Sequence, residues 1–340
     1  MVLTKEIAPM NNVILLKNRP KGKPTLQDFE FAKEEMPQPK EGEILLKAKY
    51  VSVDPYLRGR MRDEKSYIPP FEVGKPLESG IIAEVAESFN KNFKKGDFVN
   101  GMLQWKQFQT SNGNGLNKVD GEKAPLKAYL GVLGLTGLTA YLGLKKIGKL
   151  EKGETLLVSG AAGAVGSVVG QIGKIKGCKV VGIAGSEEKI DRIQEKFGFD
   201  ACINYKTTDN MKKAIAEACP DGVDVYFDNV GGEILDAALT NMNKYGRVIN
   251  CGAISLYNET ETSMGPRVET TLIKNSILMQ GFTVRDFVKD FGPAQKQLAQ
   301  WMEEDKLAYM ETAVEGFENI PQAFIDLFDG KNKGKMIVIV

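Results

Sequence analysis

The first residues with the spacing to do chemistry are the glycines of Gly160-Ala-Ala-Gly163-Ala-Val-Gly166. They follow the apolar run TLLVSG and precede a helical pattern, which is the setting in which a glycine motif indicates a nucleotide site. Glycines at 163 and 166 would let backbone N–H groups approach a pyrophosphate at the start of the helix. Ala161 stands where GxGxxG has its first glycine, so a tight turn without a ligand is the alternative. Five further strand units follow, and they favour dinucleotide binding.

The end of the second strand bears on which dinucleotide would bind. NAD sites usually place an acidic residue there, about 20 residues beyond the glycines, to bind the ribose 2′-hydroxyl. This strand ends at Ala184-Gly185-Ser186 without an acid at its tip, although Glu187 and Glu188 follow inside the helix. Lys189 comes next and Tyr205 ends the third strand, a combination that fits a 2′-phosphate better than a free hydroxyl. We therefore predict NADPH; the alternative is that Lys189 is solvated, as most helix lysines are.

The absence of histidine from the whole chain excludes several kinds of catalytic site. No Ser-His-Asp or Cys-His apparatus can be assembled. The four cysteines, at positions 178, 202, 219 and 251, form no CxxC pair, and all but the third lie in or beside apolar runs, where core packing is expected. A zinc ion would find only scattered cysteines and carboxylates, so we expect no metal site.

Composition limits the class of partner. Lysine and arginine total 45 against 44 aspartates and glutamates, and a net charge of +1 gives no electrostatic basis for binding nucleic acid or an anionic membrane. The amino-terminal MVLTKEIAPMNN lacks the apolar core of a signal peptide, and no apolar run approaches the length of a membrane span. We expect a soluble, cytoplasmic protein of roughly two domains that acts on a small molecule.

The middle of the chain alternates short apolar runs with helical patterns. The runs typical of strands are TLLVSG (155–160), KVVGIAG (179–185), ACINY (201–205), VDVYFDN (223–229), RVINCG (247–252) and SILMQGF (276–282). The helical patterns lie near 164–176, 187–197, 209–218 and 232–243. Continuous apolar strands alternating with helices predict an α/β fold with a doubly wound parallel sheet, a Rossmann domain.

The beginning and the end of the chain have another pattern. Residues 1–128 hold most of the prolines and several short strands bounded by glycine, which predicts a mostly antiparallel β domain. The tail returns to this style, with helical patterns near 292–304 and 321–329 before the strand KMIVIV. We expect residues 1–128 and 300–340 to form a substrate domain, into which residues 129–299 are inserted as the dinucleotide-binding domain. The polar, glycine-rich residues 111–122 predict a surface loop.

Seven segments together resemble the zinc-independent medium-chain dehydrogenases/reductases. They are VDPYLRGRM, TGLTAY, GAAGAVG, GCKVVGIAGS, YFDNVGG, CGAISLYN and the terminal GKNKGK. More narrowly, they look like the prostaglandin reductase, alkenal double-bond reductase and curcumin reductase group, over nearly the full length. The resemblance implies a GroES-like domain around the Rossmann domain, a homodimer, and NADPH-dependent reduction of the C=C bond of an α,β-unsaturated ketone or aldehyde.

The resemblance also implies residues on the cofactor side. Those expected around the 2′-phosphate are Gly185, Ser186, Lys189 and Tyr205, and those expected along the cofactor are Asn229 and Asn332. The same motifs complete the predicted cofactor-binding set with Gly163, Ala164, Val165, Gly166, Thr139 and Cys251.

Reduction of an enone requires a hydrogen-bond donor near the substrate carbonyl. Hydride addition to the β-carbon develops negative charge on that oxygen, and a donor aimed at it lowers the barrier. Without histidine or zinc the donor would be a tyrosine, a lysine, a serine, a backbone N–H or the cofactor ribose. We expect Tyr257, which follows the loop after RVINCG at the carboxyl edge of the sheet and, by resemblance, lies beside nicotinamide and substrate. The alternative is a loop aromatic packed under a lid.

The segment VSVDPYLRGRM (51–61) is the predicted substrate side. Its proline breaks a strand and sets Tyr56 just past the strand end. By resemblance Tyr56 lines the substrate pocket, and we count it as a catalytic and substrate-binding candidate. Arg58 would bind a substrate carboxylate or brace the strand end. Trp105 would line the pocket or belong to the core.

Other functions remain compatible with the residues. A quinone reductase of the same superfamily would share the cofactor site and differ in its substrate pocket. An NADPH-binding protein without turnover would keep the cofactor residues alone. A zinc alcohol dehydrogenase is nearly excluded by the missing histidines.

Overall fold

The computed structural model describes residues 10–340, and their contacts divide into two units. Within these residues, unit 1 comprises 10–130, Ala313–Asp329 and Met336–Val340, and unit 2 comprises Gly131–Thr312 and Gly330–Lys335. Residues 300–312 and 330–335 therefore belong by their contacts to unit 2, whereas the sequence assigned them to the first domain. The division of functions between a substrate domain and a dinucleotide domain stays a prediction.

Unit 2 is built on a six-stranded sheet with the order β10-β9-β8-β11-β12-β13. Every pairing in the sheet is parallel. The strands are β8 (Thr155–Ser159), β9 (Lys179–Ala184), β10 (Ala201–Asn204), β11 (Val223–Asp228), β12 (Met242–Asn250) and β13 (Leu278–Gly281). The strand order reverses direction between β8 and β11, and ligands of doubly wound sheets bind at the carboxyl ends of the strands beside such a point.

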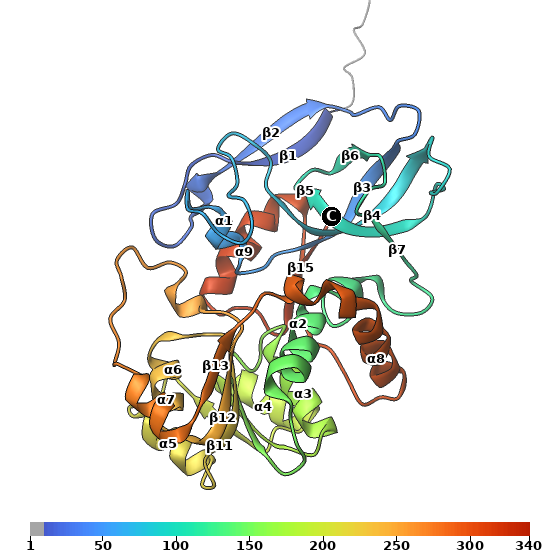
Figure 1. Cartoon of the computed structure of the whole chain (residues 1–340). Coiled ribbons are helices and arrows are strands. Elements are labelled where there is room, and N and C mark those ends of the chain that lie inside the picture. The colour runs from blue at the N-terminus through green and yellow to red at the C-terminus, as the bar shows by residue number, and fades with distance from the viewer. Residues whose placement is uncertain (1–9) are drawn as a thin grey trace, which may run out of the picture. The chain divides into compact units, whose positions relative to one another are not determined.

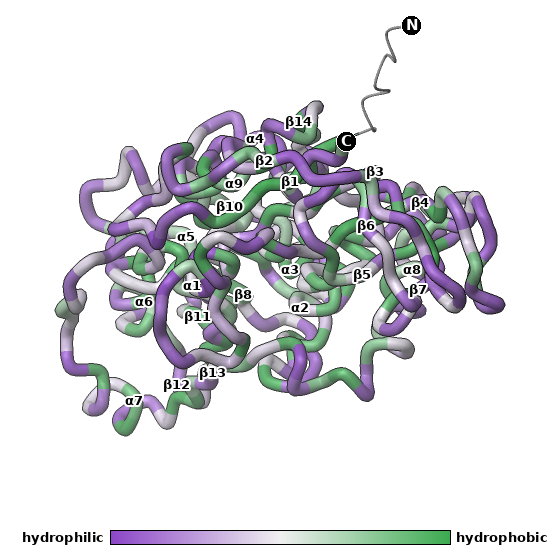
Figure 2. Tube along the Cα trace, turned by 90° about the horizontal axis from the view of Figure 1, so that it is seen from above, coloured by the Kyte–Doolittle hydropathy of each residue, from purple (hydrophilic) through white to green (hydrophobic). Residues whose placement is uncertain are grey.

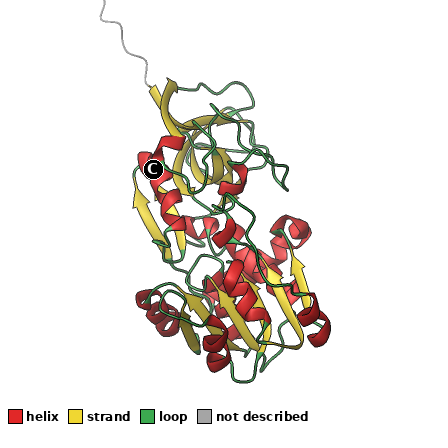
Figure 3. Cartoon of the chain, turned by 90° about the vertical axis from the view of Figure 1, so that its left-hand side faces the viewer, coloured by secondary structure: helices red, strands yellow, loops and turns green. Residues whose placement is uncertain are grey.

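Helices lie on both faces of this sheet, which Figure 3 shows with helices in red and strands in yellow. They are α2 (Leu135–Gly143), α3 (Gly166–Ile175), α4 (Glu187–Phe197), α5 (Met211–Ala218), α6 (Gly232–Leu239), α7 (Glu269–Asn275) and α8 (Phe291–Glu303). Because both faces are covered, all five residues of β8 are buried, as its unbroken apolar pattern predicts.

The local sequence explains where the helices begin and end. Ser186 caps α4 by accepting a hydrogen bond from the backbone N–H of Lys189, and Gly198 ends the helix with a positive φ of 69°. The predicted helix 187–197 is confirmed. The predicted helix 232–243 is too long, because α6 ends at Leu239 and β12 already begins at Met242. The first residues of β12 are mostly polar, so their strand character is not visible as an apolar run.

Unit 1 is mostly antiparallel. A seven-stranded sheet has the order β14-β15-β3-β4-β5-β7, with β6 paired to β3, and β1 and β2 form a separate two-stranded sheet. Its strands, of which β14 and β15 begin with residues of unit 2, are β1 (Met10–Leu16), β2 (Phe29–Glu35), β3 (Ile44–Ser52), β4 (Glu78–Ser88), β5 (Phe98–Gln104), β6 (Phe108–Ser111), β7 (Asn117–Val119), β14 (Glu311–Glu315) and β15 (Lys335–Ile339). The predicted loop 111–122 thus contains a short strand, β7.

Two α-helices belong to unit 1, and short helical turns occur in both units. The α-helices are α1 (Leu57–Arg60) and α9 (Ile320–Phe328). The shorter turns are η1 (Leu26–Asp28), η2 (Leu126–Leu130), η3 (Leu144–Gly148), η4 (Ile254–Leu256), η5 (Val284–Asp290) and η6 (Phe317–Asn319). Figure 1 labels many of these elements along the chain. The predicted fold class, a doubly wound Rossmann domain within a mostly antiparallel β domain, is confirmed.

Trp105 lies in the core of unit 1. Its side chain has no exposed surface, and its ring stacks on Phe29 with centroids 6.2 Å apart. The indole N–H donates to the hydroxyl oxygen of Ser79 at 2.9 Å, so the polar atom is satisfied inside the core. Of the two interpretations of Trp105 the core position is the one observed, and we withdraw this residue from the substrate-binding set.

Candidate active site

The glycine turn joins β8 to α3 in a form that only glycine permits. Gly160 has a positive φ of 58°. A Cβ on Gly166 would lie 2.3 Å from the carbonyl oxygen of Gly160, a backbone atom that cannot move aside. The N–H of Gly163 donates to the same oxygen at 2.9 Å. The close approach of helix and strand brings the amino end of α3 to the carboxyl edge of the sheet, where its N–H groups and dipole favour an anion.

A segment from the far end of the chain lies beside this turn. Gly163 and Gly334 form a parallel β-bridge, and the N–H of Gly334 donates to the carbonyl of Ala162 at 2.8 Å. Asn332 belongs to the same segment, and its amide donates to the carbonyl of Gly334 at 2.9 Å. The structure therefore brings two predicted cofactor residues together, Gly163 and Asn332, although they are separated by most of unit 2 in sequence.

The predicted 2′-phosphate residues gather at the carboxyl end of β9. A Cβ on Gly185 would lie 2.7 Å from the Tyr205 ring, which is too close. The half-exposed ring can therefore occupy this position only because residue 185 is glycine. The ammonium of Lys189 donates to the carbonyl of Gly330 at 2.6 Å. Burial lowers the pKa of Lys189, and the positive charges of Lys206 and Lys333 lower it further. Three ammonium groups thus share this end of the sheet, an arrangement suited to a dianion.

The two glutamates beside this cluster are both engaged. The amide of Asn204 donates to Glu187, and the ammonium of Lys333 pairs with Glu188. Arg192 lies 3.7 Å from Glu188, one helical turn along α4. The hydrogen bond from Lys333 lowers the pKa of the Glu188 carboxyl. The residues present fit an NADPH 2′-phosphate, since the acids near the ribose position have partners of their own.

Asp228, which the sequence did not single out, organises the carboxyl edge between β8, β11 and β12. Its side chain is 1% exposed. One carboxylate oxygen accepts hydrogen bonds from the hydroxyls of Ser159 and Tyr226, at 3.0 and 2.7 Å, and from the N–H groups of Val230 and Gly231, at 3.0 and 2.9 Å. Burial and the neighbouring carboxylate raise the pKa of Tyr226 well above its ordinary value. The tyrosine is therefore a permanent donor to Asp228.

Two predicted site residues, Asn229 and Cys251, are held next to this carboxylate. The N–H of Asn229 donates to the Ser159 hydroxyl oxygen at 3.0 Å, and its side-chain amide donates to the Ser159 carbonyl at 2.8 Å. The N–H of Cys251 donates to the backbone carbonyl of Asp228 at 2.9 Å. Burial and Asp228 raise the pKa of the Cys251 thiol to about 12, so this cysteine is no nucleophile at neutral pH.

Tyr257 has its hydroxyl at the carboxyl end of β12. The oxygen accepts a hydrogen bond from the N–H of Ala253 at 3.2 Å, and a Cβ added to Gly252 would lie 3.2 Å from it. The ring is half-buried, and the short turn η4 carries it back toward the strand end. Asn229 and Tyr257 therefore occupy the same edge of the sheet, because Gly252 also lies next to the backbone of Asn229.

Thr139 lies on α2. Its hydroxyl donates to the carbonyl of Leu135 one turn earlier, at 2.7 Å, and the side chain is half-buried. Its predicted cofactor contact stays a prediction.

In unit 1 the predicted substrate segment folds as a strand end followed by a turn. Tyr56 precedes α1, and its half-buried ring packs against the core of unit 1. Arg58 is 1% exposed, and its guanidinium donates to the carbonyls of Pro20 and Gly22 at 3.2 and 2.8 Å. Because this buried guanidinium is hydrogen-bonded to backbone carbonyls, Arg58 stabilises the loop before β2. We therefore withdraw Arg58 from the substrate-binding set as well.

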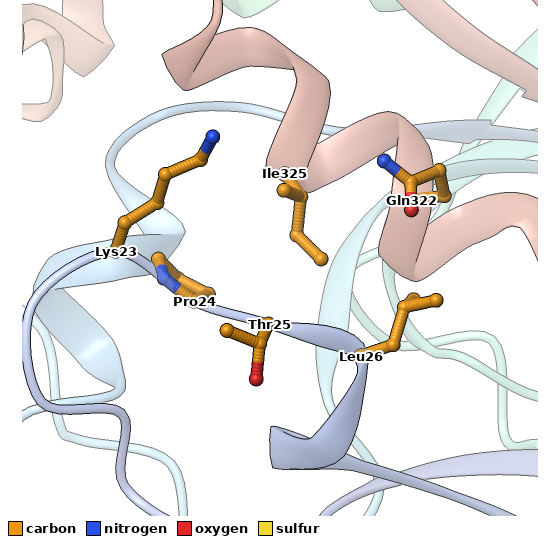
Figure 4. Close-up of a pocket in the computed structure, with 6 residues that line it drawn as sticks. All are labelled: Lys23, Pro24, Thr25, Leu26, Gln322 and Ile325. Carbon is orange, nitrogen blue, oxygen red and sulfur yellow. The ribbon is translucent and has the colours of Figure 1, made fainter.

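Figure 4 shows a pocket of unit 1 that contains none of the predicted site residues. Its lining residues are Lys23, Pro24, Thr25, Leu26, Gln322 and Ile325. The ammonium of Lys23 pairs with Asp329, and the Thr25 hydroxyl bonds to Asp28 in a helix cap. These side chains offer no catalytic arrangement.

Two family models match the chain. One, described as the N-terminal domain of oxidoreductase, covers residues 12–119, and the other, described as zinc-binding dehydrogenase, covers residues 164–303. The crystal structure of CurA in complex with NADPH from Vibrio vulnificus superposes with a TM-score of 0.92 at 40% identity, over 97% of this chain and 99% of that one.

Curated relatives match over almost their whole length. The Bacillus subtilis protein YfmJ, provisionally named an NADP-dependent oxidoreductase, is 56% identical over 96% of this chain and 97% of its own. The NADPH-dependent curcumin reductase of Escherichia coli is 42% identical over 96% of both chains. Prostaglandin reductase 1 of Bos taurus is 46% identical over 95% of this chain and 97% of its own. The chain belongs to the prostaglandin, alkenal and curcumin reductase group of the medium-chain dehydrogenases/reductases.

The description of the second family model mentions zinc, so the residues that could bind a metal ion are relevant to this medium-chain reductase. The whole chain lacks histidine. Among residues 10–340, no three Cys, Asp or Glu side chains lie so that they could hold a metal ion. In the same part of the chain, no helix has the length and apolar character needed to cross a membrane.

Two features of the reductase site were not predicted from the sequence. Asp228 had a visible signal, an acid that ends an otherwise apolar strand and precedes Asn229. The resemblance had placed Asn332 along the cofactor, but the bridge between Gly163 and Gly334 had no signal, because it depends on how the chain returns to unit 2.

The Asp228 network predicts a measurable loss of stability. Asp228→Ala removes the buried acceptor of five donors, the four described above and the Asn250 amide at 3.3 Å, and we expect the free energy of unfolding to fall by about 3 kcal/mol or more. Asp228→Asn keeps one acceptor oxygen and should lose less. The measurement is urea denaturation. Asp224→Ala is a matched control, because Asp224 lies on the same strand but is only partly buried; equal losses for the two alanine variants would contradict the role of Asp228.

Proposed function

We propose that the protein reduces the C=C bond of α,β-unsaturated ketones or aldehydes at the expense of NADPH. The observation that carries the proposal is the lysine-rich end of β9 beside the glycine turn, in a chain whose family includes reductases named for curcumin, prostaglandins and alkenals. Those named substrates support a conjugated carbonyl compound as the substrate class.

The residues of unit 2 would hold the cofactor along the carboxyl edge of the sheet. The turn of Gly163, Ala164, Val165 and Gly166 at the start of α3 would bind the pyrophosphate, and Ser186, Lys189 and Tyr205 the 2′-phosphate. Asn229, Cys251, Asn332 and Thr139 complete the proposed contacts. When bound, NADPH supplies the hydride that adds to the β-carbon of the substrate.

Tyr257 is the proposed donor to the substrate carbonyl oxygen. Its own oxygen accepts the N–H of Ala253, and a hydroxyl that accepts a hydrogen bond is polarised into a better donor. Its place at the strand end beside Asn229 supports a position near the reacting carbons. Tyr56 is proposed to line the substrate side with its ring. The α-carbon would take its proton from solvent or from a nearby hydroxyl.

Zinc independence is part of the proposal. The lack of histidine leaves cysteine and carboxylate as the zinc ligands available, and burial raises the pKa of three thiols, those of Cys178, Cys202 and Cys219, to about 11, 12 and 11. Zinc binds the thiolate, so such thiols are poor ligands. All four cysteines are free, which suits a reducing compartment and supports a cytoplasmic location.

A homodimer is proposed through the edge of the unit 2 sheet. β13 is an edge strand, and all four of its residues are exposed, including Leu278 at 48% and Met279 at 37%. Ile273 of α7 adds further exposed apolar surface, and Figure 2 shows hydrophobic positions on α7 in green. An exposed apolar edge strand can pair with another strand, and a second copy of the chain has the same edge strand.

The function is tested by NADPH oxidation over a panel of enones and quinones. We expect turnover with enones, loss of the substrate C=C bond by mass spectrometry, and unchanged rates in the presence of a chelator. Turnover of quinones alone would favour the quinone reductase. NADPH binding without turnover of either class would favour a non-catalytic binding protein.

Tyr257→Phe removes the proposed donor without removing the ring. We expect kcat to fall by roughly 100-fold, because one donor to a developing oxyanion is worth about 3 kcal/mol, while the Kd for NADPH stays the same. Steady-state kinetics and fluorescence titration measure the two. Tyr205→Phe is the matched control, since its hydroxyl is proposed to act on the cofactor and not on kcat. An unchanged kcat for Tyr257→Phe across several enones would remove Tyr257 from the mechanism.

Leu278→Lys places a charge on the edge of β13. We expect the wild-type chain to elute as a dimer and this variant as a monomer in size-exclusion chromatography with light scattering, because a charged side chain on an edge strand opposes its pairing with another strand. Tyr245→Lys alters another exposed apolar residue of unit 2 and should remain dimeric. A monomeric wild type would refute the dimer.

A further inference from the structure

One ion pair connects the returning segment 330–335 to α4. The ammonium of Lys333 bonds to the carboxylate of Glu188, with 30% and 60% of the two side chains exposed. At the other end of the segment, the carbonyl of Gly330 accepts the ammonium of Lys189. The segment therefore contacts two consecutive residues of the first turn of α4, one acidic and one basic.

Glu188 occupies a sensitive position for cofactor choice. It lies in the first turn of α4, four residues beyond Ala184 at the end of β9 and close to where dinucleotide sites that prefer NAD use a carboxylate to bind the ribose 2′-hydroxyl. A free carboxylate there would repel a 2′-phosphate. It would also reduce the attraction exerted by Lys189, because opposite charges at this distance offset each other.

Lys333 offsets the negative charge of Glu188, although it lies in the segment 330–335 and not in a Rossmann sequence motif. Its positive charge reaches Lys189 as well as Glu188, as the lowered pKa of both groups indicates. The local balance is then four cations, at 189, 192, 206 and 333, against Glu188, and the Glu187 carboxylate accepts the amide of Asn204. Without Lys333, this group would lose one cation, and Glu188 would keep only Arg192, 3.7 Å away, as an ion-pair partner among these residues.

We propose that Lys333 is a specificity-determining residue, which pairs with Glu188 and so keeps this carboxylate from opposing the 2′-phosphate of NADPH. The inference rests on the proposed function, because it assumes that the dinucleotide binds at the carboxyl end of β9. It goes beyond that function in assigning the preference for NADPH over NADH to a residue of the C-terminal segment. Lys333 acts through Glu188 and is a positioning residue, not a catalytic one.

The test measures binding of two adenosine fragments to the full chain by calorimetry. The probes are 2′,5′-ADP, which carries the 2′-phosphate, and 5′-AMP, which lacks it. We expect Lys333→Met to weaken 2′,5′-ADP about fivefold, which is ~1 kcal/mol, the upper range for an exposed ion pair. The Kd of 5′-AMP should not rise. Lys333→Arg keeps the cation and should bind both fragments as the wild type does.

The decisive variant is the double substitution Lys333→Met with Glu188→Gln. If Lys333 acts through Glu188, removal of the acid restores 2′,5′-ADP binding to within about twofold of the wild type. Lys196→Met removes an exposed lysine from the last turn of α4 and controls for the change in net charge. The same preference should appear in the ratio of KM values for NADPH and NADH.

Other outcomes overturn the inference in distinguishable ways. An equal loss in the presence and absence of Glu188 would mean that Lys333 contacts the phosphate itself. A parallel loss for 5′-AMP would mean that the pair only holds the segment in place. An unaltered Kd in Lys333→Met would refute a role in specificity while the proposed function stands. A wild type that binds neither fragment would refute the cofactor of the proposed function, and the inference with it.

Discussion

A single buried carboxylate constrains the carboxyl edge of the parallel sheet. Asp228 can lie at 1% exposure only if the surrounding groups donate to its carboxyl oxygens, and two hydroxyls, two backbone N–H groups and the Asn250 amide do so. These donors come from β8, from β11, from the loop after β11 and from β12. Fixing them in one place also fixes Asn229, which is bonded to Ser159, and the start of the loop that carries Tyr257. The geometry of the candidate site thus follows from the need to satisfy one charge.

The glycine turn and the lysine cluster are the other parts of this edge. Gly166 lets α3 approach β8 closely, and Gly185 makes room for Tyr205. In both places the missing side chain creates the space that a phosphate or its binding residues would need. The attraction for an anion then comes from the helix end and from the ammonium groups, while the acids nearby are occupied by Asn204 and Lys333.

The sequence predicted the parallel sheet, α4, the glycine turn and the group of residues at the end of β9, because each depends on local pattern or on strand ends that must share one edge. It did not predict the polar start of β12, since register there is set by the neighbouring strand. For Arg58 and Trp105 the residue type was compatible both with the substrate pocket and with a structural position in the protein. Only tertiary structure shows that Trp105 stacks on Phe29 and that Arg58 reaches the carbonyls of Pro20 and Gly22. The same limit hid the contact between Gly163 and Gly334.

The return of residues 330–335 to unit 2 makes the nucleotide unit discontinuous in the chain. A fragment cut after Thr312 would contain the glycine turn, α4 and Asp228, yet it would lack the strand-like partner of Gly163 and the cation that engages Glu188. Unit 2 therefore cannot be transferred to another protein as a single continuous segment of the chain. During synthesis, moreover, this edge of the sheet stays incomplete until residues 330–335 have left the ribosome, so the complete nucleotide unit can form only after they have emerged.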